Sequence, residues 1–160
     1  MTITITEIKP EHAVHLIGMI HELAEFERMR SSVLNNEEKL RRDIENKSVH
    51  GFIAMEGDVP AGMNLYYYAY STWVGPYLHM EDLYVRPEFR RRGLARRLWK
   101  SLANLAKEKD IQRLEWAVLD WNEGAIQLYN TVDYTNMTKT EGWYTFRMTR
   151  ENIEKFANEL

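Results

Sequence analysis

A basic turn near the middle of the sequence is the clearest candidate for chemistry. Arg90, Arg91 and Arg92 precede Gly93, and a long segment with apolar residues at helical spacing begins at Leu94. The first amides of a helix have no partner within the helix, and the helix dipole makes this end attractive to anions. The turn therefore predicts a site for a phosphorylated cofactor. The alternatives are an ordinary solvated basic turn and a nucleic-acid patch.

A second group of candidates is acidic. Glu81 and Asp82 are consecutive in a segment with strand character, so regular geometry sends their side chains to opposite faces of a sheet. Both can serve one site only if the strand bulges there. Glu27 lies one helical turn beyond Leu23, so it continues an apolar stripe and puts a carboxylate where a core residue is expected. Such a carboxylate is either held in an ion pair or a ligand-binding group.

Composition limits the possible functions. The chain has 160 residues, of which 44% are apolar and 28% charged, and its net charge of −3 is too acidic for a general nucleic-acid binder. Because cysteine is absent, disulfides, thiolate metal sites and an acyl-cysteine intermediate are excluded. The histidines form no recognisable ligand set, so no metal is expected; they are His12, His15, His21, His50 and His79.

The N-terminal residues alternate between polar and apolar like a strand and lack the apolar core of a signal peptide. No later apolar run is long enough to cross a membrane. We therefore expect a cytoplasmic protein without a membrane partner. The length suits one domain, residues 1–160, since no linker or low-complexity stretch interrupts the sequence.

The hydrophobic pattern predicts the elements that must position these residues. Strands are expected over Thr2–Ile8, Gly51–Met55, Ala61–Tyr70, Tyr77–Val85, Ile111–Leu119 and Gly142–Met148. Helices are expected from about Pro10, which the first turn tolerates, to about Ala24, and from Asn35 or Asn36 to about Lys47. Further helices are expected from Leu94 to Lys109, from Asn122 to about Thr131, and in a short C-terminal segment through Phe156. This order predicts an α/β fold in which a mixed central β-sheet is flanked by helices on both faces.

That order and several motifs resemble the GCN5-related N-acetyltransferase (GNAT) superfamily over nearly the whole chain. The basic turn fits the pattern R/Q-x-x-G-x-G/A, with Ala95 in place of the second glycine. The other motifs are Glu22–Glu27, Tyr70–Gly75, Ala117–Asn122 followed by Leu128-Tyr129, and Glu141–Trp143. They are similar to the diamine acetyltransferase branch, which holds the spermidine/spermine N1-acetyltransferases and, with the closer resemblance, the thialysine Nε-acetyltransferases.

The resemblance implies acetyl-coenzyme A as cosubstrate. In the family pattern the loop amides hold its pyrophosphate, and the neighbouring strand and the helix after Asn122 hold the rest of the molecule. The positions that match are Leu83, Tyr84, Val85, Arg90, Arg91, Arg92, Gly93, Leu94, Ala95, Arg96, Asn122, Ala125 and Tyr129. Asn122 also has a structural role open to it, as the N-cap of that helix.

The resemblance also implies catalytic roles. Tyr129 matches a general acid that protonates the departing thiolate of coenzyme A; otherwise it is a half-buried aromatic on a helix face. Glu81 would accept the amine proton through water; otherwise it is a strand charge facing solvent. In this fold the strand splays near Leu83, whose freed amide can stabilise the developing oxyanion.

An acidic and aromatic pocket would bind the cation of a small aliphatic amine such as thialysine, a lysine analogue or a diamine. Its expected residues are Phe26, Glu27, Trp73, Glu81, Asp82, Glu115, Trp116, Ala117 and Trp143. For Trp73 and Trp143 the alternative is core or dimer packing. The resemblance implies a homodimer whose C-terminal segments help to build the neighbouring site. Two other functions stay open, a protein or peptide N-acetyltransferase and a non-catalytic acyl-coenzyme A sensor.

Overall fold

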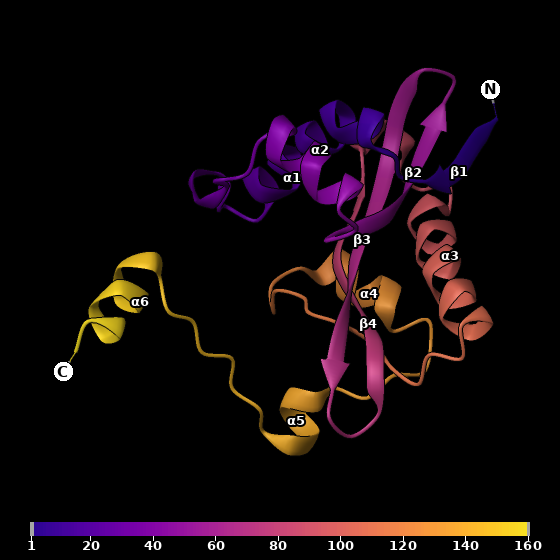
Figure 1. Ribbon diagram of the computed structural model, residues 1–160. Helices are drawn as coiled ribbons and strands as arrows, with labels where there is room; N and C mark the ends of the chain where they lie inside the picture. The colour runs from indigo at the N-terminus through magenta and orange to yellow at the C-terminus, as the bar shows by residue number, and fades with distance from the viewer. Residues whose placement is uncertain (1, 160) are drawn as a thin grey trace. The chain divides into compact units, whose positions relative to one another are not determined.

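The computed structural model describes residues 2–159, which form two compact units that meet in the sequence between Asn122 and Glu123. The first unit holds a single sheet of five strands, in the order β1-β2-β3-β4-β5 (Figure 1). The strands are β1 (Ile3–Glu7), β2 (His50–Glu56), β3 (Val59–Ser71), β4 (Gly75–Val85) and β5 (Leu114–Trp116). The first four pair antiparallel and β5 runs parallel to β4, so the sheet is mixed, as predicted.

Helices cover both faces of this sheet, as the sequence predicts. Helices α1 (Ala13–Phe26) and α2 (Glu37–Glu45) lie on one face, and α3 (Leu94–Glu108) lies on the other (Figure 1). Asn36 caps α2 by accepting a hydrogen bond from the Lys39 amide at 2.9 Å. Short 3₁₀ turns complete the unit; they are η1 (Pro10–His12), η2 (Arg30–Ser32) and η3 (Pro87–Phe89).

Two separate cores follow from the alternation of side chains along the strands. On one face, Leu16 and Met19 of α1 pack with Ile53 of β2 in a core that also includes residues of α2. The next residue on β2, Ala54, points to the other face and belongs to the core around Leu98 of α3. Burial on both faces fixes where α1 and α3 lie against β4, the strand that carries the acidic residues.

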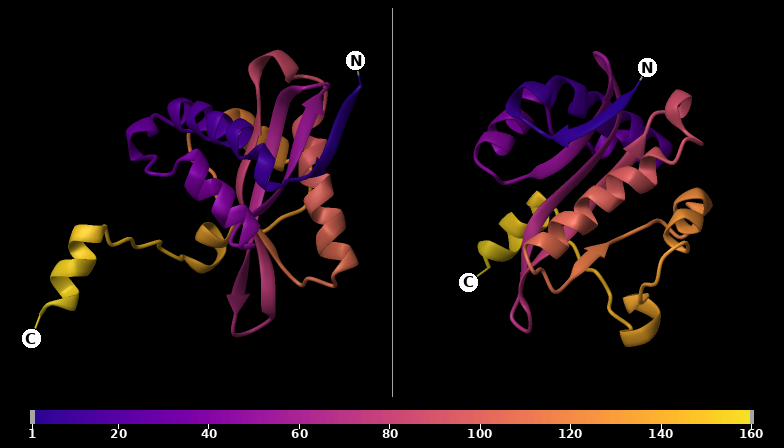
Figure 2. Two further views of the ribbon diagram at one scale, coloured as in Figure 1. Left: turned by 45° about the horizontal axis from the view of Figure 1, so that its top comes forward. Right: turned by 90° about the vertical axis from the view of Figure 1, so that its right-hand side faces the viewer.

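Strands β3 and β4 form a long hairpin that extends beyond α3 (Figure 2). Its turn exposes Trp73, which is 77% accessible, and Ser71 Oγ accepts the Trp73 amide at 3.1 Å. Among the described residues, no helix is both long enough and apolar enough to cross a membrane.

The second unit consists of helices joined by irregular chain. Helix α4 (Glu123–Tyr129) is followed by α5 (Met137–Glu141) and α6 (Arg150–Ala157). The side chain of Thr149 caps α6 by accepting the amide of Asn152. Helices α4 and α6 fall where the sequence predicts helices, whereas α5 was not predicted.

One strand prediction was wrong and another was too long. Residues 142–149, expected to contain a strand over Gly142–Met148, are irregular, because a strand exists only where a partner completes its ladder and no described strand pairs with them. Their apolar side chains are exposed, for example Phe146 at 91%. The strand expected over Ile111–Leu119 is confirmed only at Leu114–Trp116, since pairing with β4 ends there.

Candidate active site

A β-bulge places Glu81 at an irregular position in the middle of β4. Along the antiparallel pair, Leu65 lies opposite Asp82 but Tyr66 lies opposite Met80, so Glu81 is an extra residue without a direct partner on β3. A bulge breaks the strict alternation of side chains. Because of this bulge, the side chains of Glu81 and Asp82 need not point to opposite faces of the sheet and can serve one site.

The two carboxylates do act on each other, and on a third from α1. Burial, followed by the charges of Glu81 and Glu27, raises the pKa of Asp82 from 3.8 to about 7. Burial and then the charge of Glu81 raise the pKa of Glu27. Since mutual electrostatic effects of this kind require proximity, the structure brings these three predicted residues together.

Glu27 is positioned by the end of α1. It is the C-cap residue, and its amide donates to Leu23 O at 2.9 Å, one turn earlier on the stripe that packs on the sheet. The side chain is half-buried, as expected for a carboxylate that continues an apolar stripe. Among the described residues, Glu27 makes no ion pair within 4.0 Å, and the charges that bear on its pKa come from its acidic neighbour.

His79 is a neighbour that the sequence analysis missed. Its Nε2 lies 3.5 Å from Glu81 Oε2, and its ring stacks on Tyr67 with centroids 4.9 Å apart. The histidines were considered only as metal ligands, whereas the spacing of two residues along a strand would have paired this one with Glu81. The two contacts place His79 between Tyr67 and the Glu81 carboxylate.

The sheet opens beside the bulge. Pairing between β4 and β5 covers only Leu78–Met80 of β4, so from Glu81 onward β4 has no partner on its β5 side among the described residues. The side chains of Leu83 and Val85 pack in the core under α3, while Tyr84 packs in the core under α1. Their backbone groups, rather than their side chains, are therefore available to a ligand on the open side of β4.

The basic turn after β4 has the backbone shape of an anion site. Arg91 and Gly93 both have left-handed conformations, with φ of 64° and 70°. The first backbone hydrogen bond of α3 runs from the Arg97 amide to Gly93 O at 3.1 Å, so the amides of Leu94 and Ala95 precede the helical ladder. A Cβ atom at Gly93 would meet no atom within 4 Å, so glycine serves the backbone conformation and leaves the space above it open.

Two of the arginine side chains hold the turn in place. Arg90 Nε donates to Val85 O at 2.9 Å, which ties the turn to the end of β4. Arg92 lies 3.9 Å from Glu56 and over the ring of Phe89. Arg91 and Arg96 are exposed.

A hollow of about 470 Å³ lies between the end of α1 and this turn. Phe26, Tyr84, Arg86 and Arg90 are among the residues that line it. Glu22, Glu25 and Glu88 line it as well, so the hollow is bordered by both acidic and basic side chains.

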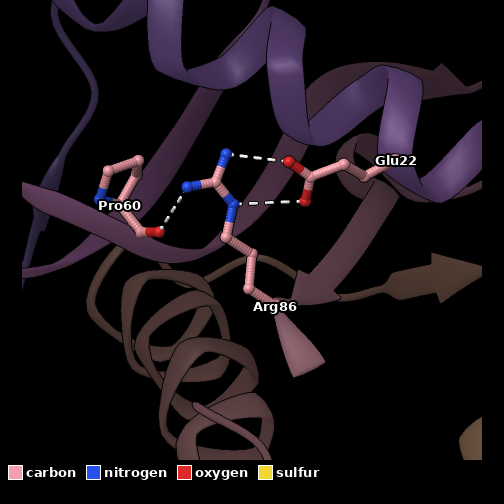
Figure 3. A network of polar contacts seen from close by, with 3 residues as sticks. All are labelled: Glu22, Pro60 and Arg86. Atoms are coloured by element: carbon pink, nitrogen blue, oxygen red, sulfur yellow. Dashed lines mark hydrogen bonds and ion pairs between the residues drawn. The ribbon is translucent and has the colours of Figure 1, made fainter. Parts of the chain in front are cut away.

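An ion pair fixes α1 against β4 at this hollow (Figure 3). Arg86 donates to both carboxylate oxygens of Glu22, from Nε at 3.1 Å and from Nη2 at 2.8 Å, and Nη1 donates to Pro60 O at 3.1 Å. This two-point geometry is the strongest form of an arginine–carboxylate contact. The pair thereby sets the position of the helix end that carries Glu27 relative to the strand that carries Asp82.

The remaining expected substrate residues are more scattered. Phe26 contacts Trp121, with ring centroids 5.7 Å apart, beside the acidic residues. Trp116 instead packs on Trp99 of α3, at 5.2 Å, on the face of the sheet away from α1. Glu115 lies opposite His79 in the parallel pairing and 3.7 Å from Arg113. Trp73 is exposed in the hairpin turn, and Ala117 is exposed directly after β5.

Three predicted residues belong to the second unit. Tyr129 is the last residue of α4 and is buried, and Ala125 is half-buried on the same helix. Trp143 is 60% exposed, and its Nε1 donates to Glu141 Oε2 at 2.8 Å. Asn122, the last residue of the first unit, donates its amide to Leu119 O at 3.0 Å.

Comparison with known proteins agrees with this architecture. Residues 17–134 match the model of the acetyltransferase (GNAT) family. The chain is 71% identical over 155 residues to a thialysine N-epsilon-acetyltransferase from Caenorhabditis elegans, and the aligned region covers 97% of each protein.

Solved structures show the same fold. An integron cassette protein from the mobile metagenome of V. cholerae superimposes with a TM-score of 0.78 at 22% identity, over 99% of each chain. An aminoglycoside N-acetyltransferase solved in complex with CoA superimposes with a TM-score of 0.69 at 18% identity, over 93% of this chain and 95% of that one.

Proposed function

This chain belongs to the acetyltransferase (GNAT) family, and we propose that it transfers an acetyl group from acetyl-coenzyme A directly to the primary amine of thialysine and related small amines. The observation that carries the proposal is the meeting of Glu27, Glu81 and Asp82 at the bulge of β4. A group of carboxylates beside an aromatic residue suits a cation on an alkyl stem. The activity of the Caenorhabditis elegans relative supports the choice of thialysine.

The basic turn fits the phosphates of the cosubstrate. The amides from Arg91 to Arg96 and the open space above Gly93 would hold the pyrophosphate, as the start of a fifteen-residue helix suits an anion. The solved acetyltransferase with bound CoA supports this assignment. When bound, acetyl-coenzyme A supplies the acetyl group as a thioester, which is already activated for transfer to an amine.

The acidic residues would prepare the amine. An alkyl amine has a pKa of about 10.4 and arrives as an ammonium ion, which is not a nucleophile. Glu27 would hold this cation, and Glu81 would accept its proton through water. Asp82 is a second acceptor, since its pKa of about 7 suits a general base at neutral pH. His79 would help to position Glu81, since its Nε2 lies 3.5 Å from Glu81 Oε2.

Two further groups would complete the transfer. The Leu83 amide, on the open side of β4, would stabilise negative charge on the carbonyl oxygen as the amine attacks. The Tyr129 hydroxyl would give its proton to the departing thiolate, whose conjugate acid has a pKa of about 8.5 against about 10 for a phenol. Asn122 and Ala125 would contact the cosubstrate near Tyr129.

We also infer one domain over residues 1–160, because the family match spans the boundary between Asn122 and Glu123. A homodimer is part of the proposal. Its support is the exposed segment 142–149, where Trp143, Tyr144 and Phe146 are 60%, 83% and 91% accessible. Such exposure is typical of a surface that a partner covers. Light scattering of the purified protein would test the dimer.

A substrate comparison tests the activity. Thialysine, lysine, putrescine, spermidine and a lysine peptide are each supplied with acetyl-coenzyme A, and thiol release gives kcat/KM. Thialysine should give the highest value. Glu27→Gln should raise KM for the amine and leave affinity for acetyl-coenzyme A unchanged, while Glu81→Gln should lower kcat.

Glu37→Gln on α2, whose carboxylate pairs with Arg41 at 2.7 Å, is the control for loss of a surface charge. If only the lysine peptide is acetylated, the enzyme is a protein acetyltransferase. If acetyl-coenzyme A binds and no amine reacts, the protein is a sensor.

A further inference from the structure

A cation adjoins the acidic residues at the end of α1. Arg28 follows Glu27, and its guanidinium lies 5.0 Å from the centre of the Trp121 ring. Phe26 contacts the same tryptophan at 5.7 Å. Trp121 lies in the segment after β5, immediately before Asn122. The contact therefore joins this segment to the end of α1, which is far away in the sequence.

The backbone around Arg28 turns sharply. Its φ is 61°, its amide donates to Glu25 O at 3.0 Å, and the Met29 amide donates to Ala24 O at 2.8 Å. These bonds define a Schellman motif in which Arg28 takes the position that glycine usually occupies. Lys47 ends α2 in the same way, with φ also 61°, so the backbone conformation alone does not distinguish Arg28.

The surroundings of the side chain do distinguish it. Arg28 is exposed, and among residues 2–159 no carboxylate lies within 4.0 Å of its guanidinium, although Glu27 precedes it in the chain. The guanidinium lies over the Trp121 ring, a cation–π contact that still allows its N–H groups to donate hydrogen bonds. A planar, oriented guanidinium of this kind is well suited to bind a carboxylate.

The site thus offers opposite charges to the two ends of one ligand. Carboxylates at Glu27, Glu81 and Asp82 attract the amine that is acetylated, and Arg28, the next residue after Glu27, brings a positive charge to the same end of α1. A diamine would bring only a second cation toward Arg28, whereas a basic amino acid would bring an α-carboxylate beside its α-ammonium group. Like-charge contact of this kind is a means of rejecting the wrong ligand.

We propose that Arg28 binds the α-carboxylate of the substrate and so selects basic amino acids over diamines. The inference rests on the proposed function, since it assigns a specificity to the same amine site. Trp121 holds the guanidinium through the contact at 5.0 Å.

The test compares two substrates that differ only in the carboxylate, thialysine and bis(2-aminoethyl) sulfide. In Arg28→Gly, KM for thialysine should rise about tenfold, the equivalent of about 1.4 kcal/mol for a lost charged hydrogen bond. KM for bis(2-aminoethyl) sulfide should stay the same or fall. Arg28→Lys should keep part of the preference because it keeps the charge.

Arg28→Gly also suits the fold, since glycine takes a left-handed φ without strain, and its melting temperature should not fall. Lys47→Gly is the matched control, as it removes a cation from the same conformation on another helix and should change neither KM. If Arg28→Gly shifts KM equally for both substrates, or for neither, the carboxylate assignment is overturned while the proposed activity stands. If the wild-type enzyme acetylates neither amine, the proposed function itself fails.

Discussion

Arg86 and Glu22 join the strand that carries the acidic residues to the helix that ends beside them, through two hydrogen bonds of 3.1 and 2.8 Å. Both side chains are partly buried, so removal of one leaves the other with an incompletely solvated charge. We expect Arg86→Met to lower the free energy of unfolding by about 1–3 kcal/mol.

Urea denaturation would measure this change. Arg30→Met is the matched control, because Arg30 pairs with Glu25 at 3.1 Å but both side chains are more than 60% exposed. Its effect should stay within about 0.5 kcal/mol. Equal losses in the two variants would mean that the Glu22 pair does not anchor α1.

Gly93 should be essential for binding acetyl-coenzyme A. Glutamate at this position would add a negative charge and bulk where the pyrophosphate is expected, and affinity should fall at least about tenfold. Calorimetric titration of the folded variant with acetyl-coenzyme A measures the effect.

A left-handed φ strains any residue with a side chain, so Gly93→Glu needs a control with the same strain. Gly75→Glu provides it, since Gly75 has a φ of 81° and open space around its Cβ position in the turn between β3 and β4. Normal binding by Gly93→Glu would remove the anion site from this turn.

Tyr129→Phe should lower kcat about 100-fold, because it removes only the hydroxyl proposed to protonate the thiolate. Affinity for acetyl-coenzyme A should change little, since the ring remains. Steady-state kinetics and a binding titration separate the two effects. Tyr134→Phe is the control on a second hydroxyl in the same unit, one that donates to Asn130 at 2.6 Å; a kcat similar to that of Tyr129→Phe would argue against a specific acid role.

Asp82 should make stability depend on pH. Its pKa is raised to about 7 in the folded protein, so its contribution to stability is present below about pH 4 and is lost as the pH rises through 7. Asp82→Asn removes the charge, so we expect it to be more stable than the wild type at pH 8, by about 1–3 kcal/mol after screening by solvent.

Thermal or urea unfolding at pH 8 and at pH 4 would measure the difference, which should disappear at the lower pH. Asp58→Asn, in the exposed turn between β2 and β3, serves as the control for an ordinary aspartate. A gain that is the same at both pH values would show that Asp82 is not buried against its acidic neighbours.

Much of the fold could be predicted because the pattern of the sequence is local. Apolar residues at helical spacing located both ends of α3 to within one residue and both ends of α1 to within about three, and the glycine before Leu94 marked the start of α3. The strand expected over Gly142–Met148 failed for the opposite reason, because a strand depends on a partner that the pattern of one segment does not reveal.

The residues of the candidate site divide in the same way. The sequence by itself identified Glu27, Glu81 and Asp82, because charged residues on apolar stripes or strands stand out from their neighbours. Their convergence was decided by the tertiary structure, since it needs the bulge in β4 and the position of α1. The contact between Arg28 and Trp121 had no signal in the sequence, because long-range contacts are made by the packing of whole elements rather than by any local pattern.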